Sequence, residues 1–217
     1  MLAVGAVIFD MDGVLIDSEP LYMEQERRSF ARYGISLDTP ELARFVGTTQ
    51  AYMWSAIKHE YGLTESLDLL MAQHQQQVVR SMSAVPLLAM VGTQPLLAAL
   101  KSAGVLCAVA SSSPRELVNV VLRETGLRSY FDEVICGDDV KQSKPNPEIF
   151  LLSAKKLGLR PEQCVVIEDS CHGVAAAKAA TMFCIGLINA NSGQQDLSRA
   201  DIRVYGHDEI LEWFSEI

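Results

Sequence analysis

The sequence predicts an α/β fold, a doubly wound parallel sheet with a small all-helical domain inserted after the first strand. Six short apolar runs, rich in valine, isoleucine and cysteine, indicate strands that are buried on both faces of a sheet. Helical segments separate most of these runs, an alternation typical of parallel sheets that bind ligands at the carboxyl ends of their strands. Between the first two runs lies a long stretch with helical patterning only, which indicates the inserted domain.

Turn residues bound the predicted strands, and glycines follow the helices between them. The strands are expected at residues 3–9, 105–110, 133–136, 164–167, 182–188 and 202–204. The three clearest helices of the sheet domain are expected at residues 93–103, 114–125 and 147–157. Thr93 is expected to cap the first of these helices.

The helical insertion is expected to occupy residues 18–85, and the sheet domain residues 1–17 and 86–217. The chain crosses between the two parts near Asp17 and again at residues 85–86. We expect these crossings to be hinges, so that the insertion acts as a lid over the sheet domain.

Within the insertion, Thr39 and Pro40 are expected to be the N-cap and first residue of one helix, because proline is favoured at that position. The last helix of the insertion has a mainly apolar face at helical spacing. This face is formed by Leu67, Leu70, Met71, His74 and Val78.

Composition indicates a folded globular enzyme, since hydrophobic residues make up 49% of the 217 residues and charged residues 21%. The formal net charge of −9 argues against a nucleic-acid-binding protein, which usually has a basic face. No apolar stretch reaches the ~18 residues that a membrane-spanning helix needs, and the N-terminal residues have no signal-peptide pattern. We therefore expect a cytoplasmic protein without nucleic-acid or membrane partners, and we also expect a monomer.

Asp10 and Asp12 follow the first predicted strand in the segment FDMDG. Side chains alternate along a strand, so the carboxylates at these two positions can lie on one side. Two carboxylates this close repel each other unless a cation lies between them or one holds a proton. One could then attack phosphorus while the other transfers a proton. The alternative is a turn that is merely capped by aspartate side chains.

Two further polar segments follow later strands, VASSSP and SKPNP. Hydroxyl and N–H groups at a strand–helix junction can bind an anion, which makes Ser111 the first candidate phosphate ligand and Ser112 a second. Alternatively, Ser112 and Ser113 cap the following helix. Lys144 precedes a proline, which restricts its backbone to extended conformations, and its ammonium could neutralise phosphoryl oxygens. The alternative for Lys144 is a solvated surface lysine.

Glu168 and Asp169 end another predicted strand in the segment VVIEDS. Carboxylate oxygens presented together suit Mg²⁺, which takes a few carboxylates and completes its shell with water and substrate phosphate. Alternatively, Ser170 and Gly173 only mark the start of a helix. Each of the four polar groups is a weak signal alone, but all four follow predicted strands at one edge of the sheet. Together they predict a phosphoryl-transfer site.

These segments resemble the motifs of the haloacid dehalogenase superfamily of phosphotransferases over essentially the whole chain. DMDGVLIDSEP is similar to its first motif, ASS to its second, SKPNP to its third and IEDS to its fourth. The helical insertion between the first two motifs is similar to the cap of the β-phosphoglucomutase-like and sugar-phosphatase branch. The resemblance implies a Rossmann-like core with a small helical cap.

The resemblance also implies a Mg²⁺-dependent phosphomonoester hydrolase that acts on small phosphorylated metabolites, sugar phosphates above all, through an aspartyl-phosphate. Asp10 would be the nucleophile and a metal ligand. Asp12 would protonate the leaving oxygen, then activate water, and would bind Mg²⁺ through its backbone carbonyl. The phosphate ligands implied are Ser111 and Lys144, and the remaining metal ligands Asp169 and, nearby, Glu168. True dehalogenases of this superfamily use a single acid without metal, and the paired acids disfavour that chemistry here.

A β-phosphoglucomutase-type reaction is the alternative within this family. Relative to those mutases, Tyr22 stands in place of a gating histidine, and Gln50, in the segment GTTQ, stands in place of an arginine. His74 takes the place of a lysine, while Glu19 is similar to the sugar phosphatases. A mutase must hold a second phosphate, so the loss of both basic side chains favours a phosphatase. Glu19, Gln50 and His74 are candidate substrate contacts, although Gln50 could be a cap or solvent-facing and His74 a core residue.

Two alternatives come from other classes of protein, a phosphate-accepting receiver domain and a catalytically inactive scaffold. The large helical insertion and the nucleophile on the first strand argue against a receiver. The filled catalytic positions argue against an inactive scaffold. A receiver would accumulate phosphoaspartate, whereas a phosphatase turns over p-nitrophenyl phosphate.

Overall fold

The computed structural model describes residues 4–45 and 48–216, where a six-stranded sheet forms the centre of the molecule. All the strand pairings are parallel, in the order β3-β2-β1-β4-β5-β6, which confirms the predicted doubly wound sheet. Ala3, the expected start of the first strand, and Gly47 of the GTTQ segment lie outside the described residues. The strands are β1 (Ala6–Phe9), β2 (Leu106–Ala110), β3 (Glu133–Ile135), β4 (Cys164–Glu168), β5 (Phe183–Leu187) and β6 (Ile202–Val204).

The three central strands, β1, β2 and β4, end at nearly the same level of the sheet. Phe9 at the end of β1 is paired with Val109 of β2 on one side and with Ile167 of β4 on the other. The polar residues that come after these strands therefore emerge side by side at one edge. This register, rather than nearness in the sequence, determines which side chains can act together.

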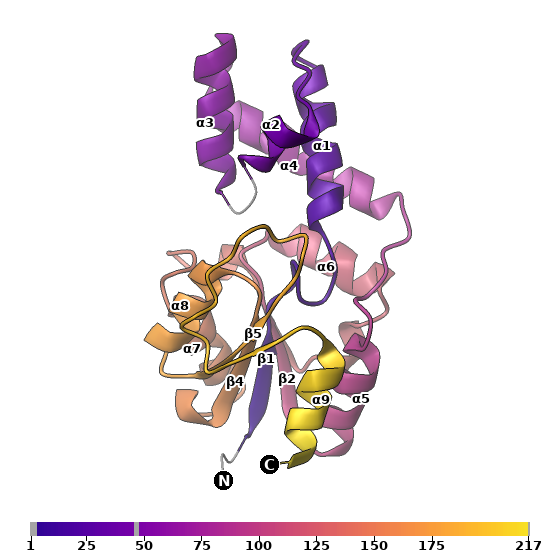
Figure 1. The fold of residues 1–217 in the computed structure, drawn as a ribbon, viewed down its shortest axis with the longest axis vertical. Coiled ribbons are helices and arrows are strands. Elements are labelled where there is room, and N and C mark those ends of the chain that lie inside the picture. Colours follow the sequence, from indigo (N-terminus) through magenta and orange to yellow (C-terminus); the bar gives the residue numbers. More distant parts are fainter. Residues whose placement is uncertain (1–3, 46–47, 217) are drawn as a thin grey trace.

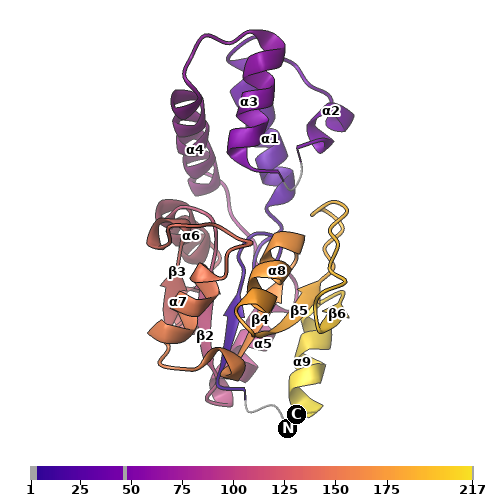
Figure 2. The same cartoon turned by 90° about the vertical axis from the view of Figure 1, so that its left-hand side faces the viewer.

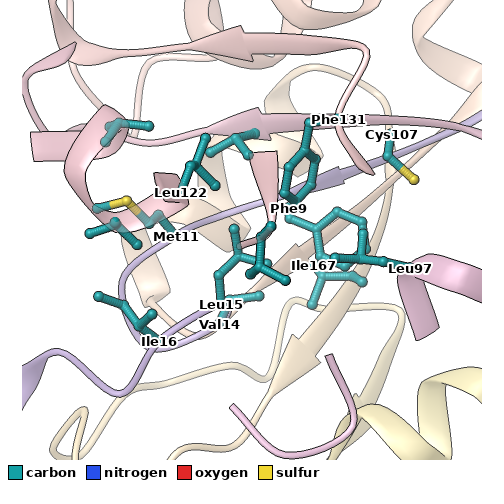
Figure 3. Close-up of a cluster of buried hydrophobic side chains, with 14 of the residues drawn as sticks. Phe9, Met11, Val14, Leu15, Ile16, Leu97, Cys107, Leu122, Phe131 and Ile167 are labelled. Carbon is teal, nitrogen blue, oxygen red and sulfur yellow. The ribbon is translucent and has the colours of Figure 1, made fainter. Parts of the chain in front are cut away.

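Helices cover both faces of the sheet, because side chains of β1 alternate between two apolar clusters. Val7 and Phe9 belong to the cluster on the face covered by α5, α6 and α9, and Ala6 and Ile8 to the cluster under α7 and α8. Figure 3 shows the packing around Phe9, including its edge-on contact with the ring of Phe131. These helices are α5 (Thr93–Ser102), α6 (Arg115–Glu124), α7 (Glu148–Lys156), α8 (Cys171–Ala179) and α9 (His207–Glu216).

Four helices between β1 and β2 are grouped apart from the sheet, beyond the carboxyl ends of its strands (Figures 1 and 2). They have their own apolar cluster, in which Trp54 meets the ring of Phe30 edge-on at 5.1 Å between ring centroids. These helices are α1 (Glu19–Ala31), α2 (Thr39–Ala43), α3 (Gln50–Tyr61) and α4 (Leu67–Ser83). The exact division at residues 18–85 and the hinges stay predictions.

The mainly apolar face expected on α4 is divided between two clusters. Leu70 packs inside the helical insertion, whereas Val78 joins the cluster on the sheet side, where α4 lies against α6. Helix α4 thus connects the insertion to the sheet domain by apolar packing. None of the helices within the described ranges has the length and hydropathy that a membrane span requires.

Two of the predicted helix caps were wrong by one residue. Asp38, not Thr39, caps α2, because its carboxylate accepts the Glu41 N–H and the Glu41 carboxylate accepts the Asp38 N–H. Gly92, not Thr93, precedes α5; it has φ +85°, and a Cβ there would lie 2.9 Å from the Cβ of His207. The predicted glycine stops after α5, α6 and α7 are all in the left-handed conformation.

Candidate active site

Lys144 lies at the centre of the polar residues that emerge from the sheet edge. Its Nζ donates to Asp10 Oδ1 at 2.6 Å, to Glu168 Oε1 at 2.6 Å and to the backbone oxygen of Ala110 at 2.9 Å. One ammonium group therefore joins the ends of β1, β2 and β4. The side chain is only 7% exposed, so the solvated surface lysine is ruled out.

The charge of Lys144 is maintained by its two acidic partners. Burial works to lower the pKa of Lys144, but the carboxylates of Asp10 and Glu168 outweigh it and raise the pKa above its ordinary value. The ammonium is therefore a permanent positive charge at this edge of the sheet.

Asp10 follows β1 directly and is held by the neighbouring strand, since its backbone N–H donates to the Ile167 carbonyl at 3.0 Å. Burial raises the pKa of its carboxyl well above the usual range, opposed by Lys144. Lys144 binds the Oδ1 oxygen. Within the part of the chain that the structure describes, no hydrogen bond is donated to Oδ2, so one oxygen of Asp10 is available to react or to bind a ligand.

Glu168 and Asp169 are fixed by the start of α8. Glu168 is fully buried, and its Oε2 accepts from the backbone N–H groups of Asp169 and Ser170 and from the Ser170 hydroxyl at 2.9 Å. Ser170 also caps α8 by accepting the Gly173 N–H. A Cβ at Gly173 would lie 1.9 Å from the Glu168 carboxyl carbon. The predicted helix start and the predicted acidic pair are therefore both present, and each depends on the other.

The carboxylates of Asp10, Glu168 and Asp169 could hold a metal ion. One oxygen from each lies within 4.8 Å of the others, and all three residues are buried. Burial and the charge of Glu168 raise the pKa of Asp169 to about 7. Three buried carboxylates around a single ammonium fit a divalent cation that prefers oxygen ligands, because Lys144 balances only part of their charge.

Asp12 points to a different set of partners. Its Oδ1 accepts from the Tyr22 hydroxyl at 3.1 Å, and its Oδ2 accepts from the Ser113 hydroxyl at 2.9 Å. Burial raises the pKa of Asp12, and hydrogen bonds from Ser18, Ser113 and Tyr22 oppose the rise. The carboxyl is thus poised to hold or release a proton, which is what an acid–base group needs.

Gly13 allows the chain to turn closely past the acidic cluster. Its φ of +77° favours glycine, and a Cβ there would lie 1.8 Å from Asp169 Oδ2. The Gly13 carbonyl accepts from Asn189 Nδ2 at 3.2 Å. Any larger residue would have to displace Asp169.

The three serines after β2 have different surroundings. Ser111 is 1% exposed, its hydroxyl oxygen accepts the Ser113 N–H at 3.1 Å, and the preceding residue, Ala110, accepts from Lys144 through its backbone oxygen. Ser112 is exposed. The expected capping by Ser112 and Ser113 was wrong, because α6 begins after Pro114 without a side-chain cap and Ser113 binds Asp12 instead.

The three candidate substrate contacts in the insertion also differ from one another. Glu19 begins α1, where burial and the charges of Asp12 and Asp17 raise its pKa to about 7. Gln50 begins α3 and is half-buried. His74 is 2% exposed, with its Nδ1 2.8 Å from the Ser29 hydroxyl, so the structure supports the core alternative for His74.

Sequence reasoning missed the contribution of the segment after β5. Ser192 donates a hydrogen bond to Asp169 Oδ2, and Asn189 supports Gly13. The signal was available, because NANS is a polar segment directly after an apolar strand, as at the other four sites. In the sequence, Tyr22 differs from the residue found in the mutases, but no local pattern indicates its hydrogen bond to Asp12.

Known proteins resemble this chain along nearly its whole length. The family described as haloacid dehalogenase-like hydrolase matches residues 7–187. A phosphorylated carbohydrates phosphatase of Thermotoga maritima is 35% identical over 98% of this chain and 99% of its own length. A fructose-1-phosphate phosphatase of Escherichia coli is 36% identical over 82% of this chain and 93% of its own. The crystal structure of a putative β-phosphoglucomutase from Thermotoga maritima superposes with a TM-score of 0.82 at 35% identity, covering 99% of this chain and all of that one.

Proposed function

Because this chain belongs to the haloacid dehalogenase-like hydrolases and is a phosphatase, we propose that it hydrolyses small phosphorylated metabolites, mainly sugar phosphates, through a phosphorylated Asp10. The observation that carries this proposal is the buried Asp10 whose Oδ1 is held by Lys144 while its Oδ2 accepts no hydrogen bond from the described residues. The named activities of the two phosphatase relatives support the sugar-phosphate class.

In the first step, Asp10 Oδ2 attacks phosphorus, and the bond from phosphorus to the leaving oxygen breaks. Asp12 donates its proton to that oxygen, so the product leaves as an alcohol. Lys144, which lies between β3 and α7 and whose ammonium reaches the end of β2, offers a positive charge to the phosphoryl oxygens, which carry more charge in the transition state. The buried Ser111 hydroxyl is the proposed neutral ligand for the same oxygens.

In the second step, water attacks the phosphorus of phosphorylated Asp10, and the bond from phosphorus to Oδ2 breaks. Asp12, now ionised, takes the proton of this water, which returns the site to its starting state with inorganic phosphate as product. The hydroxyls of Tyr22 and Ser113 hold Asp12 in one orientation for both transfers. A raised pKa suits a group that must be protonated in one step and ionised in the next.

Mg²⁺ is the proposed cofactor, held by the carboxylates of Asp10 and Asp169 with Glu168 beside them and the backbone carbonyl of Asp12 as a further ligand. When bound, it would supply positive charge to the phosphoryl group and orient it for in-line attack. The protein residues prepare this site by holding Glu168 on backbone N–H groups and Asp169 on Ser192.

A mutase is not favoured, although the structural relatives include a putative β-phosphoglucomutase of Thermotoga maritima and a β-phosphoglucomutase of Clostridium difficile. A mutase must hold a second phosphate, and the two positions that would do so are Gln50, which is neutral, and His74. Burial lowers the pKa of His74 to about 4, so this side chain is uncharged at neutral pH. Neither residue offers a charge to a second phosphate.

The test is a screen of phosphorylated sugars and p-nitrophenyl phosphate with Mg²⁺, in which release of inorganic phosphate is measured. We expect turnover by the wild-type protein and less than a tenth of it in Asp10→Asn, with circular dichroism unchanged. Incubation with β-glucose 1-phosphate distinguishes the mutase, because sustained formation of glucose 6-phosphate instead of free phosphate would overturn the proposal.

A further inference from the structure

Helix α1 has a polar face that begins at the acid–base residue and continues away from the sheet. Glu19, Tyr22 and Glu26 recur at spacings of three and four residues, which places their side chains on one face of the helix. The Tyr22 hydroxyl bonds to Asp12, so the lower part of this face is turned toward the reaction centre. Figure 1 shows α1 rising from the end of β1 away from the sheet.

The two glutamates on this face lack partners. Both are half-buried, and within residues 4–45 and 48–216 no side chain or backbone N–H forms a hydrogen bond or ion pair with either carboxylate. By contrast, Glu24 on the opposite, exposed side of α1 forms an ion pair with Arg28 at 2.8 Å. A half-buried carboxylate without a donor is costly and calls for an explanation.

Among the residues that the structure describes, no cation compensates the charge of Glu26. Burial and the charge of Glu19 raise the pKa of Glu26 to about 7, and no basic group lowers it. The negative charges of Asp12 and Asp17 also help to raise the pKa of Glu19. The positive charge of the site lies instead at Lys144, which is engaged by Asp10 and Glu168 at the sheet edge.

These positions match the two ends of a substrate. The leaving oxygen must lie at Asp12, beside Tyr22, and Glu26 lies one helical turn farther along the same face, about 6 Å away along the axis. The body of a small sugar can bridge that distance. Its hydroxyl groups can donate the hydrogen bonds that the two glutamates lack, whereas a second phosphate or a carboxylate would meet uncompensated negative charge.

We propose that Glu26, together with Glu19, selects substrates with one phosphate and an uncharged, hydroxyl-bearing body, by accepting hydrogen bonds from hydroxyl groups and by repelling a second anionic group. This inference rests on the proposed function and extends it, because it assigns Glu26 as a specificity residue and excludes sugar bisphosphates as preferred substrates.

The experiment compares Glu26→Gln with Glu24→Gln, which makes the same charge change on the exposed side of the same helix. Binding of a hexose monophosphate and of a hexose 1,6-bisphosphate is measured by calorimetry in the Asp10→Asn background, so that no turnover is needed. Turnover of p-nitrophenyl phosphate by the wild-type protein and by Glu24→Gln tests the proposed function separately, since that substrate has no hydroxyl-bearing body.

We expect the protein with Glu26 intact to bind the monophosphate more tightly than the bisphosphate. Glu26→Gln should change the ratio of the two dissociation constants by about tenfold in favour of bisphosphate binding. Glu24→Gln should leave both the ratio and the turnover of p-nitrophenyl phosphate unchanged. An unchanged ratio in Glu26→Gln, an equal shift in Glu24→Gln, or failure of the protein to bind either sugar phosphate would overturn the inference. Absence of p-nitrophenyl phosphate turnover would instead overturn the proposed function.

Discussion

Replacing Lys144 with methionine should destabilise the protein far more than removal of a surface lysine. Methionine has a similar length but no charge, so the carboxylates of Asp10 and Glu168 lose the donor that both share at 2.6 Å. Their side chains are 11% and 0% exposed, which leaves little water to replace the ammonium. Breaking a buried ion pair in this way costs about 3–5 kcal/mol, a large share of the roughly 5–15 kcal/mol that stabilises a typical domain.

The matched control is Lys178→Met. Lys178 also contacts a carboxylate at 2.6 Å, that of Asp201, but the two side chains are 28% and 30% exposed. Water and salt screen such a pair, so its loss should cost about 0–1 kcal/mol. The two lysines therefore differ in burial rather than in distance.

The measurement is urea unfolding followed by circular dichroism at pH 7 without divalent metal. A double-mutant cycle of Lys144→Met and Asp10→Asn should show a coupling of at least about 1 kcal/mol in the free energy of unfolding. The reason is that the neutral amide of Asn carries no charge for the ammonium to balance. If Lys144→Met loses no more stability than Lys178→Met, or if the cycle shows no coupling, the reasoning about the buried charge network is wrong.

Three further predictions concern the metal site, the close turn and a buried histidine. Asp169→Ala should raise the Mg²⁺ concentration needed for half-maximal turnover by more than about tenfold; an unchanged metal titration would remove Asp169 from the site. Gly13→Ala should abolish turnover, because its Cβ would collide with Asp169 at 1.8 Å, and should cost at least about 1–2 kcal/mol of stability from backbone strain alone; a crystal structure with Asp169 unmoved would refute this. Burial lowers the pKa of His207 to about 4, from a value of 6.5 in the unfolded chain. The unfolded chain therefore binds a proton at this histidine more readily than the folded protein does. The free energy of unfolding is not reduced by this effect above pH 6.5, and it falls as the pH decreases from 6.5 toward 4. Between pH 7 and pH 5 the wild-type protein should therefore lose about 2 kcal/mol more stability than His207→Gln, and equal losses in urea titrations would contradict the assignment.

Most of the site was predictable because a parallel sheet brings together the residues that come directly after its strands. Asp10, Lys144 and Asp169 were each found from a polar residue placed just after an apolar run, or between strand and helix. That rule needs only the sequence, because the register of a buried parallel sheet brings the carboxyl ends of its strands to one edge. The same rule would also have found Ser192, had it been applied to the segment after β5.

Other features depended on side-chain directions that no local pattern contains. Ser113 was expected to cap a helix and instead binds Asp12, because the chain turns at Pro114 before α6 begins. The one-residue error at Thr93 has a similar origin, since His207, more than a hundred residues away, packs against Gly92. Both outcomes are contacts between distant segments.

By itself, the sequence determined the parallel sheet, the helical insertion and the identity of the charged residues at the sheet edge, because strand periodicity and glycine stops are local properties of the chain. Only the tertiary structure decided how those charges are shared. Lys144 serves Asp10 and Glu168 at once, Asp12 turns to Tyr22, and Glu26 is left without a donor among the described residues. The reason is physical: burial and distance set the strength of a charge interaction, and both are defined only when strands and helices distant in the sequence come together.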